Sequence, residues 1–212
     1  MNRPGHALHG FMLALVTPPD DHQAEPALLE SFRNVGLEHL HIRKPGFSRD
    51  ELRAYLSGLS PELLSISRIH SHYELAQEFG AGGVHLTEFA RSSGLRASDF
   101  PGVPVSASFH DPRSLAAEGL GYDRVFLGPV FRSISKPSLE PGLNHGELRE
   151  FLRKFHLPVI ALGGIAPSNV GACREIGFSG AAALGWVWHA RDPLRAFGEL
   201  TMAVATLNPK HA

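Results

Sequence analysis

The sequence has little cysteine, little net charge and no long apolar run. Its single cysteine, Cys173, excludes an internal disulfide and a cysteine-ligated zinc site, and it agrees with a reducing compartment. Twenty basic and 21 acidic side chains give a net charge of −1, which excludes a broad surface for nucleic acid or an anionic membrane. No window approaches the roughly 18 apolar residues of a membrane span, and the first residues lack a secretory signal pattern. We therefore expect a cytoplasmic protein whose anion sites, if any, are local.

Eight apolar, strand-like segments alternate with helix-like segments along the 212 residues. The expected strands cover 11–17, 37–42, 63–70, 82–86, 103–109, 123–128, 157–163 and 179–185. Continuous apolar strands separated by helices are typical of parallel sheets, whose two faces are both buried. Since eight such units close into a barrel whose interior is filled by side chains, the pattern predicts an α/β fold of the (β/α)8 TIM-barrel type, a single domain over residues 1–212.

Histidines stand at or near the ends of four successive expected strands. They are His41, His70, His85 and His110. Chemistry in a barrel lies at the carboxyl ends of its strands, so these imidazoles are expected to converge. Two interpretations stay open: proton transfer and hydrogen bonding around an organic substrate, or a zinc or iron site completed by a carboxylate, as in a metallohydrolase. The first strand lacks the His-x-His opening of barrel metallohydrolases, which favours the first interpretation and no resident metal.

Anion-binding side chains and paired glycines follow the second, sixth and seventh expected strands. They are Arg43 and Lys44, then Ser133, Ser135 and Lys136, then Gly163 and Gly164. Cationic and hydroxyl groups donate to oxyanions, and adjacent glycines let backbone N–H groups approach a ligand closely. Barrels commonly bind phosphate near their last strands, so these residues predict a pocket for a phosphorylated small molecule.

The same strand-end motifs resemble, in order and over nearly the whole chain, those of the thiamine phosphate synthase and TenI family. HIRKP resembles Q-x-R-x-K, GGVHLTE resembles G-V-H-L-G-Q, and SASFHD resembles V-S-x-H. GPVFRSISK resembles G-P-x-F-x-T-x-T-K and ALGGI resembles A-I-G-G-I, and these two matches are the most specific. The resemblance implies a (β/α)8 barrel of thiamine biosynthesis that binds a thiazole phosphate.

The resemblance also implies roles for individual residues. The family's synthases join a thiazole phosphate alcohol to a pyrimidine methyl pyrophosphate, while Mg²⁺ neutralises the departing pyrophosphate. By resemblance, Arg43 and Lys136 would hold the pyrophosphate, Ser108 would lie near the reacting centre, and His85 would contact the pyrimidine. The residues that would hold the thiazole phosphate are Ser133, Ser135 and Gly164.

The chain departs from the synthase pattern at both acidic Mg²⁺ ligands. Ser71 stands where the pattern has the first aspartate, and Ala90 stands where it has the second. His70 replaces a neighbouring asparagine, and His41 replaces the glutamine of the second strand. Mg²⁺ prefers hard carboxylate oxygens, so its ordinary role is doubtful here.

These losses point toward the TenI side of the family, which aromatises a thiazole carboxylate phosphate by a proton shift and uses no pyrophosphate. The TenI histidine of G-H-V-F is Pro129 here, so another group must carry the proton. The catalytic candidates are His41, His70, His85, His110 and Lys136.

We therefore expect TenI-like proton transfer on a phosphorylated thiazole. The alternatives are a divergent synthase that also takes the pyrimidine pyrophosphate, and a non-catalytic paralogue that binds thiazole phosphate without turnover. Mg²⁺ is expected only for the synthase, and no other cofactor is expected. The apolar FGELTMAVATL segment fits a homodimer contact or a helix packed on the barrel equally well.

Overall fold

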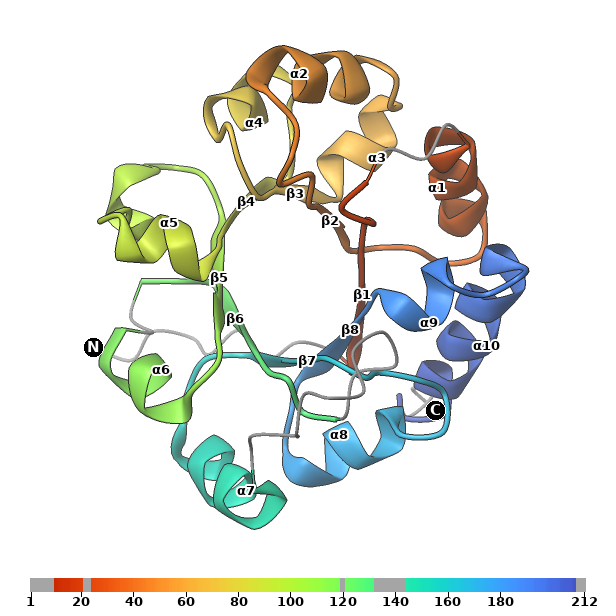
Figure 1. Ribbon diagram of the computed structural model, residues 1–212. Helices are drawn as coiled ribbons and strands as arrows, with labels where there is room; N and C mark the ends of the chain where they lie inside the picture. The colour runs from red at the N-terminus through yellow and green to blue at the C-terminus, as the bar shows by residue number, and fades with distance from the viewer. Residues whose placement is uncertain (1–9, 21–23, 119–120, 132–143, 209–212) are drawn as a thin grey trace.

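The computed structural model describes residues 10–20, 24–118, 121–131 and 144–208. In these ranges eight parallel strands form a closed barrel in sequence order, and helices surround it in the view along the barrel axis (Figure 1). The strands are β1 (Met12–Val16), β2 (Leu40–Ile42), β3 (Ser67–Ile69), β4 (Gly83–Leu86), β5 (Val105–Phe109), β6 (Arg124–Leu127), β7 (Val159–Leu162) and β8 (Gly180–Ala183). Met12 of β1 pairs with Gly180 of β8, which closes the cylinder. The predicted (β/α)8 fold is confirmed.

Most helices lie in the connections that the sequence predicted. They are α1 (Glu25–Asn34), α2 (Arg49–Ser57), α3 (Pro61–Ser65), α4 (Glu74–Glu78), α5 (Glu88–Ser92), α6 (Pro112–Glu118), α7 (His145–Lys154), α8 (Val170–Ile176), α9 (Gly185–Trp188) and α10 (Pro193–Ala205), with a 3₁₀ turn at Ala97–Asp99. Phe197 and Leu200 of α10 are buried in the apolar core, so much of this helix's apolar surface is covered within the chain, by α1, α8, α9 and β1. No helix among the described residues is long and apolar enough to cross a membrane.

The third strand begins later than the pattern predicted. Of the expected strand 63–70, the first residues belong to α3, and only Ser67–Ile69 is strand. The Ser60 side chain accepts a hydrogen bond from the Leu63 amide at 3.2 Å, and Pro61 occupies the first turn of the helix. A serine N-cap followed by proline favours helix initiation, which outweighs the strand preference of the short apolar run.

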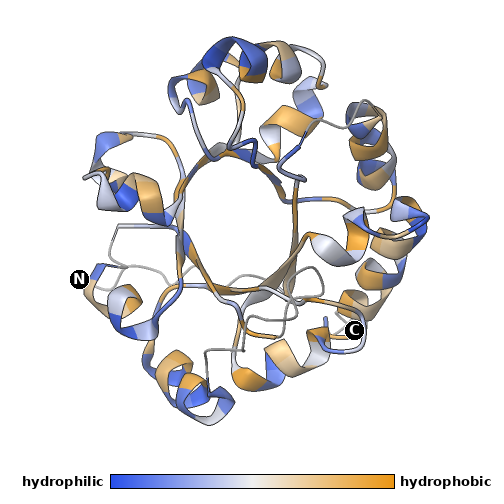
Figure 2. Cartoon of the chain, viewed as in Figure 1, coloured by the Kyte–Doolittle hydropathy of each residue, from blue (hydrophilic) through white to orange (hydrophobic). Residues whose placement is uncertain are grey.

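The apolar core has two parts. One lies between the strands and the helices, where, for example, Leu52 and Leu56 of α2 are buried while the hydrophilic residues of that helix face outward (Figure 2). The other lies inside the barrel and consists of Met12, Ala14, Val16, Phe126, Ile160 and Ala182. These interior residues come from β1, β6, β7 and β8 alone. The interior side chains of β2 to β5 are largely polar, so the barrel has an apolar half and a polar half.

An ion pair crosses the barrel interior near the amino ends of the strands. Arg68 of β3 is buried, and its guanidinium binds both carboxylate oxygens of Asp123, at 2.8 Å for the Nη1–Oδ1 contact. A bidentate pair of this kind satisfies the buried guanidinium. The opposite, carboxyl end of the barrel is where the remaining interior polar groups gather.

Candidate functional site

A pocket of about 500 Å³ lies over the carboxyl ends of β2, β3 and β4. Its lining residues are Arg43, Lys44, Pro45, His70, Ser71, His72, Tyr73, Thr87, Phe89, Ala90, Ser93 and Leu95. The segment after β2 supplies the cations, the segment after β3 supplies His70 to Tyr73, and the α5 region supplies the apolar wall. A pocket at this end of a barrel is the expected place for a substrate.

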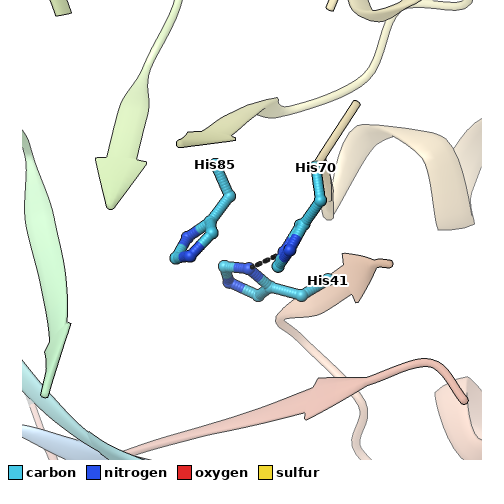
Figure 3. A group of neighbouring side chains, drawn as sticks. All are labelled: His41, His70 and His85. Atoms are coloured by element: carbon cyan, nitrogen blue, oxygen red, sulfur yellow. Dashed lines mark hydrogen bonds between the residues drawn. The ribbon is translucent and has the colours of Figure 1, made fainter. Parts of the chain in front are cut away.

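Three of the predicted histidines meet beneath this pocket. His41 of β2, His70 just after β3, and His85 of β4 point toward one another inside the barrel (Figure 3). His41 Nδ1 lies 3.0 Å from His70 Nε2, and the His70 and His85 rings stack with centroids 4.2 Å apart. All three side chains are buried. The predicted convergence of these imidazoles is therefore what the structure shows, although it does not test their catalytic role.

The hydrogen-bond partners of His85 favour one assignment of its ring proton. We assign the Ser106 hydroxyl as donor to the Val84 carbonyl at 3.3 Å, in which case it accepts from His85 Nδ1–H at 2.9 Å. His85 Nε2 then carries the lone pair and accepts from the Ser108 hydroxyl at 2.6 Å. Ser108, His85 and Ser106 therefore form one directed chain of hydrogen bonds that ends on backbone.

The His41–His70 pair has two free ends. A neutral imidazole has one N–H and one lone pair, so the 3.0 Å contact uses one proton and one lone pair. The two remaining ring nitrogens are His41 Nε2 and His70 Nδ1. Whichever ring donates in the 3.0 Å contact, one of these nitrogens carries an N–H and the other a lone pair. His70 Nδ1 is buried and has no hydrogen-bond partner among the described residues. The pair can accept a proton at one end and release one at the other without becoming charged.

Burial keeps all three imidazoles neutral. It is the largest cause that holds the pKa values of His41 and His85 well below the ordinary value of 6.5, and the neighbouring histidines lower both further. The pKa of His70 is lowered to about 3, first by burial and then by the charges of Arg43 and Arg68. A positive field from cations and a site that excludes water both disfavour imidazolium. An anion bound beside Arg43 would offset part of this field and raise the pKa of His70.

Arg43 and Lys44 are adjacent in sequence but have different surroundings. The Arg43 amide donates to Thr17 Oγ1 at 2.9 Å, which fixes the backbone from which its side chain lines the pocket. No carboxylate of the described residues lies within ion-pair distance of its guanidinium, so Arg43 suits the predicted anion-binding role. The Lys44 ammonium instead donates to Glu25 at 2.6 Å and to the carbonyls of Pro18 and Asp20. Its three N–H groups are thus satisfied within the protein.

His110 and the glycines of the seventh loop do not line this pocket. His110 Nδ1 donates to the Gly128 carbonyl at 2.7 Å, and its half-exposed ring lines a separate hollow of about 220 Å³ with Glu88. Gly163 and Gly164 have φ values of +94° and +66°, which favour glycine. The predicted phosphate-binding residues of the sixth loop, Ser133, Ser135 and Lys136, lie outside the described residues. Their roles stay predictions.

The pocket does not fit the Mg²⁺ that the synthase resemblance implies. Ser71 and Ala90, which stand at the positions of the two family aspartates, both line the pocket, and no carboxylate does so among the residues described. Hydroxyl, imidazole and apolar groups do not replace the hard, charged oxygen ligands that Mg²⁺ requires.

Sequence reasoning missed two aromatic residues of the site. The Phe126 ring contacts His41 and His85, with centroids 4.5 and 4.9 Å away. Side chains alternate between the two faces of a strand, and Phe126 lies on the same face as Gly128 at the strand end. This alternation could have predicted that the Phe126 ring faces the site. Phe89 lines the pocket and is 83% exposed. An isolated aromatic residue in the polar stretch TEFARSS was the available signal.

The closed barrel and its carboxyl-end pocket define a protein of the TIM-barrel class with a candidate site for a small molecule. A family model described as thiamine monophosphate synthase, TMP-TENI, matches residues 13–187, and the chain belongs to this family.

Individual relatives agree with the family model. The chain is 30% identical over 207 residues to the thiamine-phosphate synthase of Bordetella bronchiseptica. This match spans 92% of this chain and 94% of that protein. It is 37% identical over 122 residues to that of Nitrosococcus oceani, a match that spans 56% of this chain and 55% of that protein. The crystal structure of thiamine phosphate pyrophosphorylase from Bacteroides thetaiotaomicron superposes with a TM-score of 0.78 at 26% identity, covering 94% of this chain and 99% of that one.

Proposed function

We propose that this protein catalyses a TenI-like proton shift that aromatises a phosphorylated thiazole carboxylate in thiamine biosynthesis. The observation that carries this proposal is the composition of the carboxyl-end pocket. It contains cations and imidazoles but no carboxylate among the described residues, and it lies above three buried, neutral histidines. Such a lining suits an anionic substrate and proton transfer, and it does not suit Mg²⁺-assisted departure of pyrophosphate.

The reaction is an isomerisation: one proton leaves a carbon of the substrate, another carbon receives one, and no co-reactant is consumed. His70 lines the pocket and is one end of the His41–His70 pair, which can exchange an N–H for a lone pair. The Ser108 hydroxyl, held by His85 Nε2, is a second proton-transfer group. We assign His70 and the Ser108–His85 pair as the two proton carriers, with Arg43 holding an anionic group of the substrate.

A divergent synthase is the second candidate. The names of the relatives from Bordetella bronchiseptica and Nitrosococcus oceani favour it, since both are thiamine-phosphate synthases. In that case Arg43 and other cations would have to neutralise pyrophosphate without the family's two aspartates.

The test offers the purified protein two reactions, each with Mg²⁺ and with a chelator. One is aromatisation of the thiazole carboxylate phosphate, and the other is coupling of the pyrimidine pyrophosphate with thiazole phosphate, with products followed by chromatography. We expect aromatisation that does not depend on Mg²⁺. General acid–base groups typically contribute about 100-fold or more, so His70→Asn and Ser108→Ala should each lower kcat by about that factor.

The exposed His156 provides the matched control, and His156→Asn should leave turnover unchanged. Thiamine phosphate formed only with Mg²⁺ would contradict the proposal and establish the synthase. Saturable binding of thiazole phosphate with neither reaction would establish the non-catalytic paralogue.

A further inference from the structure

Two departures from the family pattern meet at the same point of the barrel. His41 stands where the family has glutamine and His70 where it has asparagine, and both lie against His85, which matches the family histidine. Ser71 and Ala90 replace the aspartates of the hard-oxygen metal site nearby. The chain has therefore lost a carboxylate site and gained a cluster of nitrogen donors beside it.

The spacing of the three imidazoles suits one metal ion. One ring nitrogen from each of His41, His70 and His85 lies within 4.8 Å of the others, and His41 Nδ1 and His70 Nε2 are 3.0 Å apart. Zinc–nitrogen bonds of about 2.0–2.1 Å place tetrahedral ligands roughly 3.4 Å from each other. The closest pair already has nearly this separation. The third imidazole must approach by up to roughly 1.4 Å, toward which rotation about its broad χ2 torsion contributes.

The surroundings resemble those of a nitrogen-ligated metal centre. Ser106 accepts the Nδ1–H of His85, and the Nε2 lone pair accepts from the Ser108 hydroxyl at 2.6 Å, a contact that a metal ion would have to replace. Outer-shell partners such as Ser106 orient metal-binding imidazoles. Phe126 contacts two of the rings and limits access of water from the apolar half of the barrel.

The positive charge of nearby arginines is the main effect that opposes the binding of a metal cation. Two carboxylates face the nearby arginines: Asp123 binds both Arg68 and Arg124, and Glu118 binds Arg91. They offset part of the positive field, and Arg43 has no carboxylate partner in the described part of the chain. The site therefore favours an ion with strong affinity for imidazole over Mg²⁺ or Ca²⁺, which need anionic oxygen ligands.

We propose that His41, His70 and His85 form a three-histidine site for one late first-row divalent ion, with Zn²⁺ as its representative. The fourth coordination position belongs to water or to the Ser108 hydroxyl, which faces His85 Nε2. Three imidazoles with an open fourth position are a ligand set that proteins use for zinc.

The test measures metal binding directly, without substrate. Untagged protein is stripped with a chelator and titrated with Zn²⁺ against a chromophoric chelator, and with Co²⁺ while its visible absorption is recorded. We expect one Zn²⁺ per chain in this site and an intense, tetrahedral-type Co²⁺ spectrum. His41→Gln and His70→Asn, which restore the family residues, should each weaken Zn²⁺ binding by about 100-fold or more, since even outer-shell changes typically cost 10- to 100-fold.

His156→Asn and His189→Asn remove exposed histidines and should leave the affinity and the Co²⁺ spectrum unchanged. Circular dichroism and thermal unfolding establish that each variant is folded. Zn²⁺ affinity that is the same in the wild type and in a folded His41→Gln/His70→Asn double variant would overturn the proposal. So would an octahedral-type Co²⁺ spectrum.

One consequence rests on the proposed function. Zn²⁺ would occupy the lone pairs that the proton shift needs, so it should inhibit aromatisation, and a chelator should restore the rate. The two proposals can fail separately, because metal binding is measured without turnover and turnover is measured in a chelator.

Discussion

At the scale of single residues, the two adjacent cations after β2 have different roles: Arg43 faces the pocket, and Lys44 stabilises the fold. Arg43 lines the pocket, while Lys44 is buried with its ammonium 2.6 Å from the Glu25 carboxylate. The Tyr55 hydroxyl also donates to Glu25, and Lys44 binds two carbonyls of the segment after β1. Lys44 therefore joins β2 to α1 and to the loop before it, and it holds in place the backbone that presents Arg43.

Breaking this buried pair should be costly. Lys44→Met removes the ammonium that binds the buried Glu25 carboxylate, and the loss of one partner of such a pair typically costs about 3–5 kcal/mol of unfolding free energy. Urea unfolding measures this loss. Arg49→Met is the matched control, because Arg49 pairs with Glu74 at the surface and should change stability by about 1 kcal/mol or less.

A second variant shows whether the charge or the packing is responsible. Glu25→Gln/Lys44→Met removes both charges and should be more stable than Lys44→Met alone. A Lys44→Met protein with unchanged stability but weakened affinity for inorganic phosphate would instead give Lys44 the ligand-binding role that the sequence predicted.

At the scale of elements, the sequence predicted a strand well where the signals in an apolar run favoured a strand alone. The run LLSISRIH had two: its β-branched residues fit a strand, but Ser60 and Pro61 start a helix, and the helix signal took the first residues. The strand-end rule then placed His41, His70 and His85 correctly, because parallel strands bring their carboxyl ends together. It did not separate His110 from them, since the hydrogen bond to Gly128 depends on tertiary contacts. Nor could periodicity show that Lys44 is buried against Glu25.

The loops after β6 and β7 pack so closely that one of them requires glycine. A Cβ on Gly163 would lie 2.8 Å from Pro129 Cβ and 2.9 Å from Pro129 Cα, and its φ is +94°. We expect Gly163→Ala to combine backbone strain, typically about 1–3 kcal/mol, with displacement of the Pro129 loop. Urea unfolding gives the total cost.

A substitution at Gly94 distinguishes the backbone strain from the displacement of the Pro129 loop. Its φ is +98°, close to that of Gly163, but a Cβ there would meet nothing within 4 Å. Gly94→Ala should therefore show the strain alone, and Gly163→Ala should cost clearly more. Equal losses for the two variants would mean that the loops after β6 and β7 move apart easily.

At the scale of the whole molecule, stability and chemistry occupy different regions. The layer between strands and helices is predominantly apolar around the barrel, with the Lys44–Glu25 pair as a buried exception, whereas the barrel interior is apolar only on the side of β1, β6, β7 and β8. The polar half can therefore hold neutral histidines and serines at the carboxyl end while the outer layer supplies most of the hydrophobic stabilisation. A change among the interior histidines should consequently affect function more than global stability.

The single cysteine offers a probe of that outer layer. Cys173 lies on α8, is fully buried in the core between the helices and the barrel, and burial raises the pKa of its thiol to about 12. Against an ordinary thiol pKa of 9.0, this lowers the thiolate fraction near pH 8 by roughly 1,000-fold, and the thiolate is the reactive form. Cys173 should therefore react with a disulfide reagent only when α8 leaves the barrel.

Because α8 contacts α7, α10 and β8, we expect this exposure to require global unfolding. The free energy obtained from native-state labelling should then equal the free energy of unfolding from urea, and both should fall with urea at the same slope. Met202→Cys in a Cys173→Ser background is the control: residue 202 is 72% exposed on α10, so its thiol should react without urea. Labelling of Cys173 that is fast and independent of urea would show that α8 opens locally, and that the outer layer does not unfold as one cooperative unit.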